Sequence, residues 1–245
     1  MQGCQDHFTG LIGLHQTNVR DDSQHASAAQ TGAFAVAFAA KRAAPELSLG
    51  TLILAAQLAD LAWPTLVLLG LEWFEVRPGI TAVTPLEFVH YPYSHSLAAM
   101  ALWGLLLALA WLALRRGTPK AALLLAAVVL SHWLLDVVAH RPDMPLTLGG
   151  EARLGLGLWN SLAGTLAVEG ALFALCTALY ARTTRALDRT GVWAFWGLVA
   201  FLLVVYVANL FGPPPPSATA VAWSAQAIWL LVAWGYWVDR HRGAR

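Results

Sequence analysis

The sequence predicts an all-α, polytopic membrane helical bundle of six full spans plus one short N-terminal helix. Its composition favours this class, because 58% of the 245 residues are hydrophobic and only 12% are charged, against roughly 25% charged in soluble domains. Long apolar runs supply the spans: 96–114 and 191–238 contain no charged residue, and 47–71 contains only Asp60. The twelve Trp residues suit a chain that crosses two membrane interfaces.

The apolar runs and the turn residues between them place the spans, each of which needs about 20 residues. The first helix is short and weakly apolar, and Pro45 follows its end. A basic turn at 115–120 and a proline-rich connector at 212–217 separate later spans. The predicted elements are 28–42, 47–71, 96–114, 121–139, 160–181, 191–211 and 218–238.

Residues 1–25 are polar and unpatterned, which predicts a disordered or artefactual N-terminal tail. Residues 26–245 predict a single transmembrane helical domain, because they contain neither an internal repeat nor a soluble segment. The net charge of +1 gives no indication of a nucleic-acid partner.

Basic residues gather at one end of the predicted bundle, and this sets its orientation. The positive-inside rule places that end, with the C-terminus, in the cytoplasm and places segments 72–95 and 140–159 outside. The basic residues on the cytoplasmic side are Lys41, Arg42, Arg115, Arg116, Lys120, Arg182, Arg185, Arg189, Arg240, Arg242 and Arg245.

His132 and Asp136 lie within a predicted span, where ionisable groups are costly and mark functional sites. Four residues apart, they are only about 40° apart on one helix face, and His140 continues that face. Imidazole with carboxylate suits a divalent ion such as zinc, manganese or iron. The alternative is a hydrogen-bonded pair between helices, which contributes only about 0.6 kcal/mol in membranes.

Asp60 and His95 are the next candidates. Pro64 cannot donate the helical hydrogen bond to the Asp60 carbonyl, which predicts a kink and a hollow there. Ser94 is expected to cap the following helix, so that His95 lies in its first turn as a neutral imidazole. Straight helices would separate Asp60 and His95 by roughly 15 Å along the membrane normal. They can share an ion only if span 47–71 is displaced outward or broken at Pro64.

Both residues also have structural interpretations. The structural interpretation of Asp60 is an acid paired to one neighbour beside a common proline kink, and that of His95 is an interfacial histidine next to Tyr91 and Tyr93. Further polar groups lie in the outer half of the predicted bundle. Glu169 is a candidate ligand, general base or salt-bridge partner. His90, His140 and Asp143 are candidates to form hydrogen bonds with the metal ligands without binding the ion themselves. Arg141 and Arg153 flank the outer mouth, where they would contact an anionic head group or the lipid surface.

Four segments in this order, 32–41, 56–60, 92–97 and 131–136, resemble a family of bacterial inner-membrane metal-dependent hydrolases, some of them LexA-regulated. The resemblance covers roughly residues 30–145. It implies a multi-pass protein of the bacterial inner membrane with Asp60, His95, His132 and Asp136 as metal ligands. It also implies a His near the start of the first helix, and Ala33 stands at the matching position.

The sequence therefore favours a membrane-embedded metal-dependent hydrolase whose His/Asp site opens to the outer leaflet. Asp136 and Glu169 are its candidate catalytic residues, and a membrane lipid or lipid-linked phosphate is the expected substrate. One alternative is a small transporter with Asp60, Glu169 and His132 as a proton or cation relay. The sequence shows no paired broken helices or repeated halves, the usual sign of such a carrier. A second alternative is a metal-binding membrane protein without catalysis, which Ala33 favours.

Overall fold

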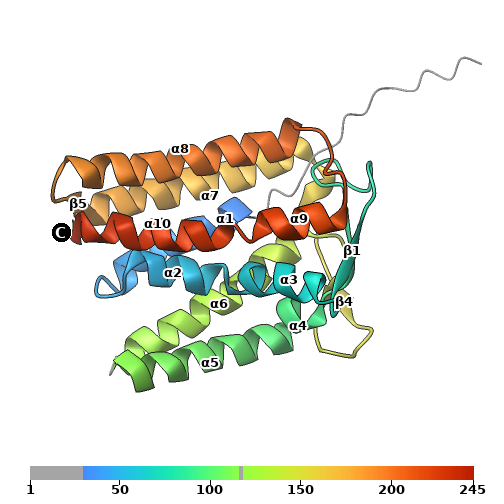
Figure 1. Cartoon of the computed structure of the whole chain (residues 1–245), viewed down its shortest axis with the longest axis horizontal. Coiled ribbons are helices and arrows are strands. Elements are labelled where there is room, and N and C mark those ends of the chain that lie inside the picture. Colours follow the sequence, from blue (N-terminus) through green and yellow to red (C-terminus); the bar gives the residue numbers. More distant parts are fainter. Residues whose placement is uncertain (1–29, 116–117) are drawn as a thin grey trace, which may run out of the picture.

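The computed structural model describes residues 30–115 and 118–245, so the predicted tail, 1–25, lies outside the described residues. Five described helical stretches are long and apolar enough to cross a membrane, the last of them Ala218–Arg240, which comprises α9 and α10; they are six if the bent pair α2–α3 counts as one span. This mostly helical bundle confirms the predicted class and indicates a multi-pass membrane protein (Figure 1). The helices are α1 (Gln30–Ala43), α2 (Leu49–Ala56), α3 (Leu58–Leu68), α4 (Pro92–His95), α5 (Leu97–Arg115), α6 (Pro119–Ala139), α7 (Leu162–Thr183), α8 (Arg189–Phe211), α9 (Ala218–Ala225) and α10 (Ile228–Arg240), with a 3₁₀ turn, η1, at Leu158–Asn160.

The helices begin where the predicted spans begin because polar connector residues cap them. In each case a side-chain oxygen accepts a hydrogen bond from the backbone amide three residues later, which satisfies a donor that the first helical turn leaves unpaired. The capping residues are Ser48, Thr118, Ser161, Asp188 and Ser217.

The predicted span 47–71 is broken, but at Gln57 and not at Pro64. α2 and α3 meet at Gln57 with a bend of 54°. Pro64 lies inside α3, and the helix continues through it because only the Asp60 carbonyl loses its helical donor there. The prediction of a break at Pro64 was therefore wrong in position, although the span is broken.

The predicted span 218–238 corresponds to α9 and α10, which form one continuous apolar stretch, Ala218–Arg240. Gln226 and Ala227 at their junction keep right-handed helical dihedrals. α9 packs on α3 and α10 packs on α2, and the Gln226 side chain donates a hydrogen bond to Thr65 Oγ1 over 3.0 Å. The bent span α2–α3 and the stretch α9–α10 thus lie side by side. Among the described residues α2–α3 is the one pair bent by more than 40°, which agrees with the expectation that the chain has no paired broken helices.

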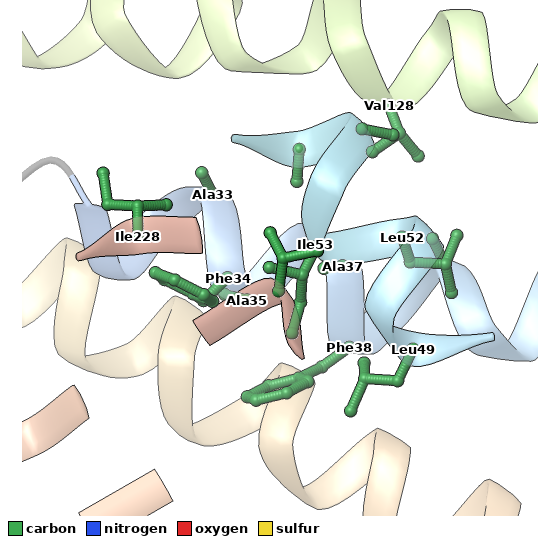
Figure 2. Close-up of a cluster of buried hydrophobic side chains, with 14 of the residues drawn as sticks. Ala33, Phe34, Ala35, Ala37, Phe38, Leu49, Leu52, Ile53, Val128 and Ile228 are labelled. Atoms are coloured by element: carbon green, nitrogen blue, oxygen red, sulfur yellow. The ribbon is translucent and has the colours of Figure 1, made fainter. Parts of the chain in front are cut away.

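α1 is too short to span a membrane and is buried on nearly every side, as expected of a helix that is apolar all round. It packs on α7, α2 and α6. Phe34 and Phe38 are fully buried, and Figure 2 shows them with Leu49 and Ile53 of α2. The Phe38 ring also lies 5.5 Å from the Tyr180 ring, between centroids. The short first helix is therefore a central element of the core.

Segments 72–95 and 140–159 lie together at one end of the bundle, the right in Figure 1. They contain two small antiparallel pairs that the all-α prediction missed: β1 (Trp73–Val76) with β2 (Leu86–His90), and β3 (Met144–Pro145) with β4 (Arg153–Leu154). Strands of two to five residues are too short for an alternating pattern to be recognised in a sequence. This end, with α4 and η1, holds the candidate site.

The opposite end joins the C-terminus to the α7–α8 connector through β5 (Thr184–Ala186) and β6 (Arg242–Ala244). His241 donates a hydrogen bond to Asp188 Oδ2 over 2.7 Å, and this contact holds the pKa of Asp188 below its ordinary value. Many of the basic residues expected in the cytoplasm lie at this end (Figure 1). The side of the membrane on which it lies stays a prediction.

A buried ion pair also ties the first helix to the last at this end. Lys41 Nζ lies 2.9 Å from Asp239 Oδ1 of α10 and donates to the Leu47 carbonyl over 2.6 Å. Farther along, α2 and α10 cross so closely that a Cβ added at Gly235 would lie 2.9 Å from the Gly50 Cα. Glycine is required at this crossing because no side chain fits between the two backbones.

Candidate metal centre

The structure brings together the four ionisable residues on which the metal prediction rests. Asp60 comes from α3, His95 from α4, and His132 and Asp136 from α6. His95 Nε2 lies 3.3 Å from Asp60 Oδ1, and His132 Nε2 lies 3.3 Å from Asp136 Oδ2. The cross distances are 3.7 Å from His132 Nε2 to Asp60 Oδ2 and 3.9 Å from His95 Nε2 to Asp136 Oδ2. The offset of roughly 15 Å expected for straight helices is absent because the α2–α3 break redirects α3.

The break in the span also fixes the orientation of His132. In an unbroken helix the Ala56 carbonyl would bond to the amide four residues later. Here α2 ends at Ala56, and this carbonyl accepts a hydrogen bond of 2.7 Å from His132 Nδ1. A carbonyl only accepts, so the Nδ1 atom of His132 carries a proton, and in the neutral ring the lone pair is on Nε2.

His95 is held in the same tautomer by a different chain of hydrogen bonds. The fully buried Glu72 accepts the Ser94 hydroxyl at Oε2 over 2.6 Å and the Tyr93 and Ser94 amides at Oε1. Because the Ser94 hydrogen points to Glu72, the Ser94 oxygen accepts from His95 Nδ1, 2.7 Å away. The Nε2 lone pair of His95 therefore also faces the cluster.

Ser94 is not the helix cap that the sequence analysis expected. It lies within the one-turn helix α4, and Ser96 accepts the Ala99 amide at the start of α5. Glu72 was missed altogether. Its only sequence signal is an acidic residue directly after a long apolar run, which is an ordinary place for a carboxylate at a membrane interface.

These hydrogen bonds leave two nitrogen lone pairs facing two carboxylates in a buried space. Asp136 Oδ2 is buried, and within the described chain no group donates a hydrogen bond to it. With both rings neutral, these groups repel one another unless a cation, either a metal ion or a proton on Nε2, lies between them. Asp60, His95 and His132 each offer one ligand atom, and these atoms all lie within 4.8 Å of one another. Nitrogen and oxygen donors of this kind suit zinc, manganese or iron.

A cavity of about 600 Å³ opens directly on the cluster. Asp60, His95, Asp136 and His140 line its polar end. The rest of its wall is largely apolar and comes mainly from α8, α9 and α10, with Phe201, Val205, Ile228, Leu231 and Trp234 among its lining residues. The last hundred residues, which carry little of the family resemblance, thus build much of the wall of the candidate site.

The predicted supporting residues divide into two groups. His140 lines the cavity and donates to Asp143 Oδ1 over 3.0 Å, and Asp143 also accepts the Tyr91 hydroxyl. Burial raises the pKa of Tyr91 well above its ordinary value, so this hydroxyl keeps its proton and its hydrogen bond. His90 is separate from the cluster: it stacks on Trp73 and lines another pocket near Arg153.

The two arginines predicted to hold an anionic head group are occupied by protein groups. Arg141 faces Glu87 and Asp143 at 3.7 and 3.9 Å. Arg153 donates to the backbone carbonyls of Asp143 and Val89. Neither arginine lines the cavity that opens on the cluster.

The structure does not bring Glu169 into the cluster. Glu169 accepts the Trp159 indole N–H over 3.2 Å and lines a second cavity of about 330 Å³ between α7 and α8. Trp159 itself lines the first cavity and stands between the two. A catalytic role for Glu169 stays a prediction.

Ala33, the position at which the family resemblance implies a His, is a buried residue of α1 (Figure 2). Comparisons of the chain with family models, with curated proteins and with solved structures find no match. The fold and the site therefore define the class of protein by themselves: a membrane-like helical protein with a buried His/Asp group that can hold a metal ion.

Proposed function

We propose that this protein is a membrane-embedded, metal-dependent hydrolase that acts on a lipid. The observation that carries the proposal is the pair of imidazoles held by hydrogen bonds at Nδ1 with both Nε2 atoms toward Asp60 and Asp136. In metal sites the ring nitrogen of a histidine that does not bind the ion typically donates a hydrogen bond to a neighbouring protein group, which orients the ring. The small gain expected from a hydrogen-bonded pair in a membrane does not account for four ionisable groups in one buried space.

In this proposal Asp60, His95 and His132 bind one divalent ion. Such an ion lowers the pKa of a bound water towards neutrality and polarises a carbonyl or phosphoryl oxygen. Asp136 Oδ2, close to both Nε2 atoms and without a donor among the described residues, is either a fourth ligand or the base that accepts the proton of the water. Trp159 and His140 both line the cavity, and their ring centroids lie 4.4 Å apart.

Access from the membrane supports a lipid substrate. The cavity reaches from the cluster to residues such as Leu230, whose side chain is 70% exposed on the outer surface of the bundle. An amphiphile can therefore approach laterally, with its apolar part against α8–α10 and its polar part at the cluster. The positive-inside rule would place this end in the outer leaflet of the bacterial inner membrane.

A transporter is the second candidate, and the break of α2–α3 beside the cluster favours it, since broken helices line the substrate sites of many carriers. The opposite half of the core argues against a through-path. There the rings of Phe38, Tyr180 and Phe195 pack on one another between the helices. Uptake of a cation or proton into proteoliposomes would support the carrier.

The test is metal content, measured by plasma mass spectrometry on protein purified in detergent without chelators. We expect near-stoichiometric zinc, manganese or iron in the wild type and its loss in His132→Ala and Asp60→Ala. His90→Ala is the matched control, because this histidine stacks on Trp73 away from the cluster, and it should retain the metal. A wild type without metal would refute the proposal, and bound metal without hydrolysis of any lipid would favour a non-catalytic metal-binding protein.

A further inference from the structure

The charge of the cavity wall restricts the substrates that the cluster can accept. Of the described residues that line this cavity, Asp60 and Asp136 are acidic and none is a lysine or arginine. One divalent ion would balance these two carboxylates, because an imidazole that binds a metal through Nε2 while Nδ1 carries the proton is neutral. A bound substrate then meets a site of no net positive charge.

A phosphate monoester fits such a site poorly. It brings up to two negative charges, and sites for phosphoryl groups clamp them with arginine, lysine or additional metal ions. The nearest candidates, Arg141 and Arg153, are held by acidic side chains and backbone carbonyls outside the cavity. An uncharged carbonyl group needs no such clamp, because a single ion can polarise its oxygen.

The apolar part of the cavity has a floor and an open side. Trp234 of α10 donates its indole N–H to the Ala194 carbonyl of α8, and its ring lies 5.7 Å from that of Phe201, between centroids. Phe201 and Trp234 close the cavity at this depth. Asn209 lies at the other end of the α8 lining, about 12 Å from Phe201 along the helix axis at 1.5 Å per residue.

The volume matches a single hydrocarbon chain. At about 30 Å³ for a water-sized group, about 600 Å³ holds on the order of 20 heavy atoms. Its lining is dominated by apolar side chains such as Val205, Ile228 and Leu231, and Leu230 connects it to the exposed surface. One acyl chain with a small polar group fits this space, whereas a lipid with two long chains and a large head group exceeds it.

We propose, on the basis of the hydrolase function above, that the substrate is an uncharged single-chain acyl ester or amide, with its chain between α8 and α10 and its carbonyl at the cluster. The oxygen of a water molecule bonds to the acyl carbon, and the bond from that carbon to the alcohol oxygen or amine nitrogen breaks. Asp136 transfers one water proton to the departing oxygen or nitrogen. The products are a fatty acid and an alcohol or amine, and no further reactant is needed.

The test compares probes that share one chain: p-nitrophenyl dodecanoate, N-dodecanoyl ethanolamine and dodecyl phosphate, with metal-loaded protein in detergent. We expect release of dodecanoic acid from the first two and at least tenfold slower release of phosphate. Leu231→Trp should shorten the chain site and lower the dodecanoate rate at least tenfold more than the p-nitrophenyl acetate rate. Leu175→Trp is the matched control, because Leu175 lies on the exposed face of α7, outside the cavity.

Binding provides a readout that does not depend on turnover. A tritiated dodecyl methyl ketone, which has a carbonyl but no bond to hydrolyse, should bind the wild type and Leu175→Trp and be lost in Leu231→Trp. Excess N-dodecanoyl ethanolamine should displace it, and dodecyl phosphate should not. Displacement by the phosphate, preferential release of phosphate or unchanged binding in Leu231→Trp would overturn the inference. Specific ketone binding without hydrolysis of any probe would instead refute the hydrolase function and leave the chain site standing.

Discussion

Replacing Glu72 with Gln should reverse the hydrogen bonds that orient His95. Glu72 Oε1 accepts two backbone amides, of Tyr93 and Ser94, over 2.7 and 2.9 Å, so the Gln carbonyl must take that side. The Gln amide group then donates to Ser94 Oγ, which lies 2.6 Å from Oε2 in the wild type. The Ser94 hydrogen must turn to His95 Nδ1, since the other acceptor, the Tyr91 carbonyl, is 3.5 Å away.

The resulting His95 tautomer carries its proton on Nε2, the atom that faces Asp60 at 3.3 Å, and it cannot bind a metal there. Changes in the groups behind a metal ligand typically weaken metal affinity 10- to 100-fold, which is about 1.4–2.7 kcal/mol. We expect a loss of this size in the Kd, measured by competition with a fluorescent chelator. Selective ¹⁵N-histidine NMR of the metal-free protein should show the proton of one ring moving from Nδ1 to Nε2.

Glu75→Gln is the matched control for this prediction. Glu75 lies on β1, three residues beyond Glu72, and its exposed carboxylate pairs with Arg77 at the surface. The same chemical change there should leave both the Kd and the histidine spectrum as in the wild type. A Glu72→Gln protein that keeps the wild-type Kd and the Nδ1 proton would refute the account of how His95 is oriented.

Three further predictions concern the scaffold. Gly235→Ala should lower the free energy of unfolding by about 1–3 kcal/mol in thermal melts, because its Cβ would meet the backbone of Gly50, whereas Gly170→Ala, with open space around it, should not destabilise. Lys41→Met should cost about 3–5 kcal/mol by leaving Asp239 without its partner, and adding Asp239→Leu should restore much of the loss. The contact that lowers the pKa of Asp188 stabilises the fold above the ordinary carboxyl value of 3.8 and is lost as the pH falls through the lower folded value. Amide exchange in 242–244, corrected for its intrinsic rate, should therefore accelerate from about pH 4 downward, and no such change is expected in Asp188→Asn, which lacks the titrating group.

The spans could be predicted because each is a long apolar run bounded by polar or proline-containing turns, and the observed helices fall within a few residues of them. The break at Gln57 could not be predicted from the sequence. A single amide side chain inside an apolar run is compatible with a continuous helix, and only the neighbouring α6 shows why α2 ends where it does. The position of Pro64 misled the prediction, because proline removes one hydrogen bond without necessarily ending a helix.

The four clustered residues were identifiable because ionisable groups are rare and costly within a membrane. The groups that orient these four residues could not be identified from the sequence. The Ala56 carbonyl has no side-chain signature, and Glu72 follows the apolar run where a carboxylate is unexceptional. Glu169 was selected by the same reasoning as the cluster, yet the structure pairs it with Trp159 in a separate cavity. Depth in the membrane alone does not tell which buried acids share a site.

The ion pair between α1 and α10 has a consequence for how this protein is made. Lys41 and Asp239 are separated by 198 residues, so at 5–20 residues per second the ribosome needs roughly 10–40 s to deliver the partner. During that interval α1 is too short to span the membrane on its own, and its lysine lacks its acidic partner. We therefore expect α1, the first helix to be synthesised, to be among the last helices to reach a stable position in the membrane, after α10 has been inserted.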